Sequence, residues 1–413
     1  MDAVSSVATC SWLTHLEAKV IMTTTDEMVG PTRAELVDRA TDLHPLLRAH
    51  AAWAETNRRA ADEVIEAMGS AGFFRMFTPL RFGGFQTGLR TAFEVCEAVA
   101  AADASAGWLL GIGAIGAFAV AQGSEQLQQE VFGQSPDVYM AGGLTPAPAR
   151  RVDGGIRVSG RWGWASGSSH AKWAALTANV LDGTEPGPYY CLAPVSEVRL
   201  EDTWHTVGMR ATASNTLVGD DLFVPEHRMI FLASLLAGRV GGEPPGSTLP
   251  YVPVGTVLLL PAILGPARAA LDLALDAASS KPIQYTFFAH QRDSVGVQMQ
   301  IGEAELKLRT ARLLSYQVAD ELDQFMGAGS LPDDSDRARY KATCAYASRQ
   351  AIGALNILID VHGAGSFAEA SPMQRYWRDA STAARHAGLN YAVAAEVYGK
   401  DLLGVDEVVS PMV

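Results

Sequence analysis

Four short segments, far apart in the chain, contain residue types that could bind a ligand or move a proton. His386 has an imidazole, which exchanges protons near neutral pH. Ser166 has a hydroxyl group that can hydrogen-bond a ligand. The glycines within residues 362–366 permit close approach of the backbone, and successive N–H groups can hold an anion. Arg292 has a guanidinium whose shape suits a phosphate.

Each of these segments also has a purely structural explanation. Ser166 could lie in a polar β-turn, and the glycines could end a helix. Arg292 could form a surface ion pair with Asp293 or Glu303. His386 could be a packed histidine on a core helix. The residue types alone leave these alternatives open, and the helices and strands that position these residues decide between them.

The composition is that of a globular protein of 413 residues, long enough for two or three packed subdomains. Its formal net charge of −13 does not favour nucleic acid as a partner, because phosphate backbones are bound by clustered Lys and Arg. Its four cysteines form no CxxC pair, and no HExxH motif occurs. We therefore expect free thiols, no metal site and a cytoplasmic location.

Two uncharged runs, residues 104–124 and residues 251–267, are long and apolar enough that each has to be considered as a possible membrane-spanning helix. The first is rich in Gly and Ala, and prolines interrupt the second, so both are predicted to be buried helices. The spacing of Gly111, Gly113 and Gly116 matches a dinucleotide-binding fingerprint. Helical residues precede it instead of a strand, so close helix packing, or room for a substrate, is the better prediction.

Hydrophobic periodicity divides the chain into helical, strand-rich and helical parts. Apolar residues recur at helical spacing from about residue 31 to 131, and again along a stripe from Val297 to Leu322. Between residues 137 and 230, short apolar runs alternate with Asp-Gly and Pro-Gly turns, which is typical of antiparallel strands. This pattern predicts a mainly α fold with a small β domain, and a mobile loop at 240–249.

Several segments resemble the flavin-binding parts of the acyl-CoA dehydrogenase fold, namely residues 164–167, 208–215, 362–365, 377–380 and 385–390. The resemblance implies an N-terminal helical domain at 29–135, a middle β-sandwich or barrel at 136–240 and a C-terminal four-helix bundle at 250–413. Residues 1–28 are expected to be a disordered extension.

One position departs from that family. Its dehydrogenases have a Glu followed by Gly-Thr as the catalytic base, whereas this chain has His386 followed by Ala and Gly. The departure resembles the two-component flavin monooxygenases of the same fold. This resemblance implies an oxygenase component that takes FADH2 or FMNH2 from a separate NAD(P)H-flavin reductase. With O2 it would form a C4a-hydroperoxyflavin and hydroxylate an aromatic substrate.

The resemblance also implies roles for individual residues. His386 would be the catalytic base that takes a phenolic proton, and Ser166 would hold N5–H of the flavin. The cofactor-binding residues would be Trp164, Ser166, Thr145, Arg292, Gly363, Gly365 and Ser366. Arg292 would reach the flavin of a neighbouring subunit in a homotetramer. Trp108 and Gly143 would contact the substrate, and Arg378 and Asp379 would form a structural ion pair.

The substrate pocket is expected to be large and apolar. Phenol and secosteroid hydroxylases of this branch tend to have a His after the Ser-x-x-Trp segment, and serines before a turn proline. Here small and apolar residues follow Trp108, and residues 141–146 are Ala-Gly-Gly-Leu-Thr-Pro. This favours a polycyclic phenol, an indole or a polyketide-type natural product.

Three alternatives to this function remain open at this point. An acyl-CoA dehydrogenase or oxidase would need a carboxylate base elsewhere, for which Glu369 and Glu396 are available. An N-oxygenase of amines or amino sugars could use the same fold and cofactor. A catalytically silent scaffold is disfavoured, because the segments that resemble a flavin site are intact.

Overall fold

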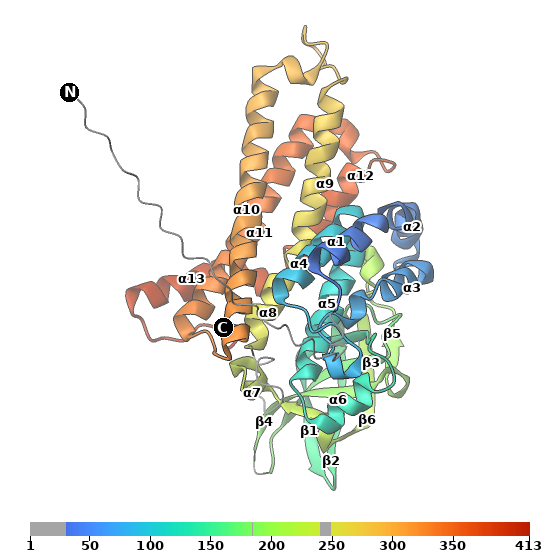
Figure 1. The fold of residues 1–413 in the computed structure, drawn as a ribbon, viewed down its shortest axis with the longest axis vertical. Helices are drawn as coiled ribbons and strands as arrows, with labels where there is room; N and C mark the ends of the chain where they lie inside the picture. The colour runs from blue at the N-terminus through green and yellow to red at the C-terminus, as the bar shows by residue number, and fades with distance from the viewer. Residues whose placement is uncertain (1–29, 184, 240–248) are drawn as a thin grey trace, which may run out of the picture. The chain divides into compact units, whose positions relative to one another are not determined.

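The computed structural model describes residues 30–183, 185–239 and 249–413, and Pro31–Val413 form one compact unit. The extension expected at residues 1–28, and nearly all of the loop expected at 240–249, lie outside the described residues. Helices come first, strands follow and helices return (Figure 1), which confirms the mainly α fold with a β region. The bounds of three separate domains stay a prediction.

The N-terminal helices are α1 (Arg33–Asp42), α2 (His44–Asn57), α3 (Asp62–Ser70), α4 (Leu89–Ala102), α5 (Ala104–Ala121) and α6 (Glu125–Phe132). The strands are β1 (Met140–Val152), β2 (Gly155–Ala165), β3 (Trp173–Val180), β4 (Gly187–Pro194), β5 (Arg199–Glu201), β6 (Asn215–Pro225) and β7 (Met229–Phe231). The later helices are α7 (Leu232–Ala237), α8 (Tyr251–Leu258), α9 (Pro261–Ala278), α10 (Val295–Ala328), α11 (Asp334–His362), α12 (Pro372–Ala383) and α13 (Tyr391–Leu403).

Helix α5 is a buried helix that packs through its small residues. The Asp103 side chain caps its first turn by accepting a backbone N–H at 2.9 Å. A Cβ at Gly111 would lie 2.8 Å from the carbonyl oxygen of Leu258 at the end of α8. Gly111 therefore serves close helix packing, as predicted, whereas Gly113 and Gly116 make room for the side chains of Tyr139 and Met140. These glycines also bring Trp108, on the same helix, into the interior.

Two helical stretches have the length and hydropathy of membrane spans, namely α5 and residues 251–278. Their most apolar windows are 94% and 89% buried inside the protein. Packing against other helices therefore removes their apolar side chains from water without lipid. The prediction that both are core helices is confirmed.

The strands of the described residues form one sheet in the order β5-β6-β2-β1-β3-β4-β7. Its pairs are antiparallel except β1 with β3, which run parallel from Met140↔Trp173 to Ala149↔Val180. The parallel pair departs from the antiparallel strands that the sequence predicted. It arises because residues 166–172 lead the chain from β2, on one side of β1, to β3 on the other.

Helices α9, α10, α11 and α12 lie side by side as a helical bundle (Figure 1). The apolar stripe predicted along α10 faces its interior. It is buried from Val297 to Leu322, with only Ile301 partly exposed. Burial of this stripe holds the bundle together, and the bundle positions α12 and the turn that follows it.

Candidate functional site

Ser166 is the first residue after β2, at the start of the segment that crosses to β3. It is only 6% exposed, and its Oγ accepts a hydrogen bond from Nε1–H of Trp108 at 3.0 Å. Trp108 belongs to α5, so the N-terminal helices and the sheet meet at this pair. One residue predicted to be catalytic and one predicted to bind substrate are therefore in direct contact.

A chain of buried hydroxyl groups continues from Ser166 into the protein. Its Oγ lies 2.7 Å from Oγ of Ser214, which lies 2.7 Å from Oγ1 of Thr212. Thr212 donates to the carbonyl oxygen of Met209 at 2.8 Å, and Nε1–H of Trp204 donates to the same oxygen at 2.8 Å. The chain therefore ends at a carbonyl oxygen whose two lone pairs are both used.

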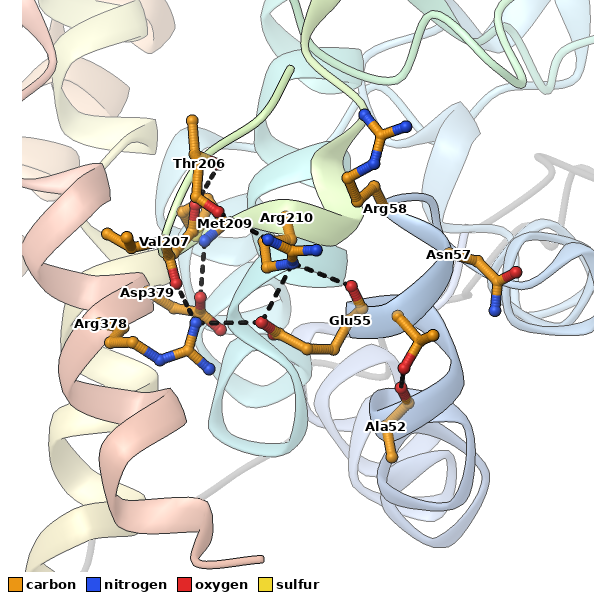
Figure 2. A network of polar contacts seen from close by, with 12 residues as sticks. Ala52, Glu55, Asn57, Arg58, Thr206, Val207, Met209, Arg210, Arg378 and Asp379 are labelled. Carbon is orange, nitrogen blue, oxygen red and sulfur yellow. Dashed lines mark hydrogen bonds and ion pairs between the residues drawn. The ribbon is translucent and has the colours of Figure 1, made fainter. Parts of the chain in front are cut away.

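Asp379 of α12 anchors the inner end of this chain. Its carboxylate accepts the N–H of Met209 at 2.6 Å (Figure 2). Burial is the main cause that raises the pKa of the Asp379 carboxyl to about 7. The Met209 hydrogen bond opposes this shift, and the carboxyls of Asp103 and Glu55 reinforce it. The carboxyl therefore titrates near neutral pH.

Among the described residues, Arg378 forms its ion pair with Glu55 of α2, 3.0 Å away, and not with Asp379 as the sequence predicted. It also donates to the carbonyl oxygen of Val207 (Figure 2). Arg210 contacts the same Glu55, with 3.3 Å between Nε and the carboxylate. Arg378 and Asp379 do not pair with each other because their side chains leave α12 on different sides. Asp379 faces the interior, whereas Arg378 lies on a more exposed side of the helix. The cluster instead joins α2, α12 and the loop before β6.

His386 precedes a short 3-10 turn, Ala387–Leu389, that follows α12. Its Nδ1 accepts the N–H of Gly388 at 3.1 Å, so the neutral ring has its proton on Nε2. The ring lies edge-on to Trp108, with centroids 5.6 Å apart. His386 is exposed to solvent, yet the protein atoms around its ring desolvate the imidazole and lower its pKa. At neutral pH it is therefore a neutral N–H donor.

Trp164 presents an uncovered aromatic surface two residues before Ser166. Its backbone has a φ of 63°, rare for a bulky residue, and it is 74% exposed. Its ring stands edge-on to Trp204, with centroids 5.5 Å apart. The isoalloxazine of a flavin, which is planar and large, fits such an uncovered face. The hydroxyl of Ser166 makes two of its three possible hydrogen bonds, to Trp108 and Ser214, so one position is left for the same ligand.

Gly143 and Thr145 lie on β1, beside the end of β2. A Cβ at Gly143 would lie 2.8 Å from the carbonyl oxygen of Gly163, so the two strands approach closely where the register of β1 shifts. Gly143 is partly exposed and Thr145 is exposed. Gly143 therefore lies against Trp162 and Gly163 of β2, and the contact of Gly143 and Thr145 with cofactor or substrate stays a prediction.

The glycine turn after α11 lies at the opposite end of α12 from His386. Gly363 ends α11 with a φ of 75°, and Oγ of Ser366 lies 3.0 Å from Nδ1 of His362. These contacts are those of a helix end, one of the two alternatives that the sequence left open. In a single chain, this turn is therefore separate from the group around Ser166.

Lys281 adds a positive charge at this turn, and sequence reasoning missed it. Its ammonium donates to the carbonyl oxygen of His362, and a Cβ at Gly365 would lie 4.0 Å from its Nζ. Space around Gly363 is open, since a Cβ there would meet no atom within 4 Å. An open backbone turn beside a cation suits a phosphate, so the helix end is also compatible with cofactor binding.

Arg292 lies on the surface at the same end of the bundle. Its neighbour Gln291 donates to the carbonyl oxygen of Val361, just before the glycine turn. The guanidinium is 61% exposed, and the carboxylate of Asp293 is 3.9 Å away. Such a loose surface pair contributes little, which leaves the guanidinium available to another group. That it serves a neighbouring subunit stays a prediction.

Other parts of the described chain add no second site of this kind. A surface hollow of about 530 Å³ lies along β2, β5 and β6, where Arg161, Arg199 and Asp220 line it, and it contains none of the predicted site residues. Within the described ranges, no group of three or more His, Cys, Asp or Glu side chains is arranged to hold a metal. The residues that sequence reasoning missed are Thr212, Ser214 and Lys281.

Comparison with known proteins relates this geometry to named enzymes. Residues 37–134 match the model of the acyl-CoA dehydrogenase N-terminal domain, and residues 258–391 match that of the C-terminal domain. The pigment production hydroxylase of a Rhodococcus sp. is 32% identical, over 89% of this chain and 96% of its own. The flavin-dependent monooxygenase oxygenase subunit HsaA of Rhodococcus jostii is 31% identical, over 89% of this chain and 98% of its own.

A solved structure is also similar to this chain. XiaF from a Streptomyces sp., in complex with FADH2 and glycerol, matches with a TM-score of 0.87 and 34% identity. The match covers 92% of this chain and 97% of XiaF, so it includes both helical parts and the sheet.

Proposed function

This chain belongs to the acyl-CoA dehydrogenase family, in its branch of reduced-flavin-dependent monooxygenases, and we propose that it hydroxylates a large aromatic natural product. It is an oxygenase component, so its reduced flavin, FADH2 or FMNH2, comes from a separate reductase. We propose a cytoplasmic location, because Cys96, Cys191 and Cys344 are buried free thiols.

The observation that supports this function best is the contact of Trp108 with both Ser166 and His386. On one side of Trp108, Trp164 offers the flavin an aromatic face and Ser166 offers it a hydrogen-bond acceptor. The other side presents His386, at the position where dehydrogenases of this fold have their Glu base. Reduced flavin, once bound, supplies two electrons and reacts with O2. The chain's own residues hold the flavin ring and orient the aromatic substrate.

We assign His386 the role of a hydrogen-bond donor to the substrate oxygen. Its Nδ1 already accepts from Gly388, so Nε2–H is the group left for a ligand. A donor in this place stabilises the phenolate form of a phenolic substrate relative to the neutral phenol. The base role expected from the sequence would require the ring proton on Nδ1, and the Gly388 N–H opposes that tautomer.

The α5 face next to Trp108 supports a large apolar substrate. Every residue of α5 is buried except Ile112, which lies one turn beyond Trp108 on the same face. An aliphatic side chain in this place offers a substrate no hydrogen bond. Together with the small Gly143, it favours a polycyclic phenol or an indole over a small polar phenol.

The assembly is expected to be a homotetramer. On the outward face of α10, Met299, Leu306 and Leu313 repeat every seven residues and are 70%, 65% and 60% exposed. Light scattering should give about four times the chain mass of 43.9 kDa, and Leu306→Glu should lower that mass. A monomer that still binds flavin would contradict both the assembly and the role of Arg292 in a neighbouring site.

Reduced flavin should bind at least about tenfold more tightly than oxidised flavin, because Ser166 can accept a hydrogen bond from N5–H. Anaerobic titration of the protein with FAD and FMN, each in both redox states, measures the four dissociation constants. Tighter binding of the oxidised form, together with reduction of that bound flavin by an acyl-CoA, would support the dehydrogenase alternative instead.

A further inference from the structure

We propose that Thr212 and Ser214 orient the proton of the Ser166 hydroxyl, so that the site distinguishes reduced from oxidised flavin. The inference rests on the proposed function, since it requires flavin N5 beside Ser166. It goes further by assigning two positioning residues that act through Ser166.

The direction of the hydrogen bonds follows from the carbonyl group at their inner end. The oxygen of Met209 can only accept, so Thr212 donates its single hydroxyl proton to it, at 2.8 Å. Ser214, whose Oγ lies 2.7 Å from Oγ1 of Thr212, must then donate to Thr212. Ser166, 2.7 Å from Ser214, must in turn donate to Ser214.

Ser166 is therefore left without a free proton. Its hydroxyl proton lies toward Ser214, and one lone pair of its Oγ accepts Nε1–H of Trp108 at 3.0 Å. The remaining position on Oγ is a lone pair, so only a donor can bond there. Ser166, Ser214 and Thr212 are 6%, 4% and 1% exposed, so water does not compete for their protons. Reversing the chain would place the hydroxyl oxygen of Thr212 against the carbonyl oxygen of Met209, 2.8 Å away, with no proton between them.

The two redox states of flavin differ in whether N5 has a hydrogen that can be donated to this lone pair of Ser166. N5 of reduced flavin has a hydrogen and can donate to Ser166. N5 of oxidised flavin has a lone pair of its own and would face the lone pair of Ser166. One hydrogen bond made in a single redox state changes the ratio of affinities by about tenfold.

Thr212→Val and Ser214→Ala test this orientation independently. The first removes the acceptor for the proton of Ser214, and the second removes the acceptor for the proton of Ser166. In both variants Ser166 becomes free to donate. The ratio of the dissociation constants of oxidised and reduced flavin should fall about tenfold. The midpoint potential of the bound flavin should then fall by about 30 mV, the two-electron equivalent of a tenfold change.

Two further variants serve as controls. Thr212→Ser keeps the hydroxyl group and should restore the wild-type ratio. Ser168→Ala removes a buried hydroxyl group that donates to the carbonyl oxygen of Ala213 at 2.8 Å, outside the chain of Ser166, and should leave the ratio unchanged. A dissociation constant does not depend on the fraction of protein that folds, so the ratio can be compared across preparations.

The outcomes separate this proposal from the function on which it rests. A wild-type protein without any preference for reduced flavin would contradict the proposed function itself. A wild-type preference that both Thr212→Val and Ser214→Ala retain in full would overturn the orientation proposal and leave the function standing.

Discussion

Replacing His386 by Ala is expected to lower the rate of substrate hydroxylation by about two orders of magnitude, the usual cost of losing one oriented hydrogen-bond donor at an active site. Reduced flavin should still be oxidised by O2, because that reaction does not involve the substrate. The electrons should then appear as hydrogen peroxide. The ratio of hydroxylated product to peroxide measures the effect, and it should fall further for a phenol than for an indole, whose ring needs no deprotonation.

His386→Gln distinguishes the donor role from the base role. A Gln side chain can donate an N–H but does not titrate, so the donor role predicts that much of the coupling returns. The base role predicts that the Gln variant couples flavin oxidation to hydroxylation as poorly as the Ala variant does. Full coupling in the Ala variant with every substrate would mean that His386 only packs against Trp108.

Replacing Asp379 by Asn should stabilise the protein increasingly as the pH rises toward 7. Burial raises the pKa of this carboxyl from 3.8 to about 7 in the folded protein. Between these values the unfolded chain has lost the proton and the folded chain retains it, so the wild type loses stability as pH rises. Asn keeps an acceptor for the Met209 N–H but does not titrate. The advantage of Asn in unfolding free energy should therefore grow by about 2 kcal/mol from pH 5.5 to 7, then level off.

Denaturant unfolding of both proteins across this pH range provides the measurement. Asp379→Ala is the matched control, because it also removes the titrating carboxyl but leaves the N–H of Met209 without its acceptor. It should be less stable than the Asn variant at every pH by about 1–3 kcal/mol. An advantage of Asn that does not change with pH would show that Asp379 does not titrate in this range.

Local patterns were enough to predict the elements of this fold. The Asp153-Gly154 pair predicted a hairpin, and the strands do pair with Val152 opposite Gly155. The stripe from Val297 to Leu322 predicted the buried face of α10, because helical spacing brings those side chains to one side. Such features depend on residues close in sequence.

The site depended on contacts between distant segments, which no local pattern contains. Trp108, Ser166 and Ser214 come from α5, the end of β2 and the residue before β6, and only folding aligns their polar atoms. The two hydroxyl residues at 212 and 214 lie within a segment that resembles the family, and their spacing of two was the available signal. The partner of Arg378 likewise comes from α2, some 300 residues earlier in the chain.

This protein should transfer one oxygen atom from O2 to an aromatic ring. The most direct test supplies wild-type protein with reduced flavin and ¹⁸O2, together with a polycyclic phenol or an indole, and weighs the product by mass spectrometry. We predict a hydroxylated product that contains one ¹⁸O atom, and no label when ¹⁸O is supplied only as water. Complete recovery of the label as hydrogen peroxide, with every aromatic compound unchanged, would show that the protein is not a hydroxylase of aromatic rings.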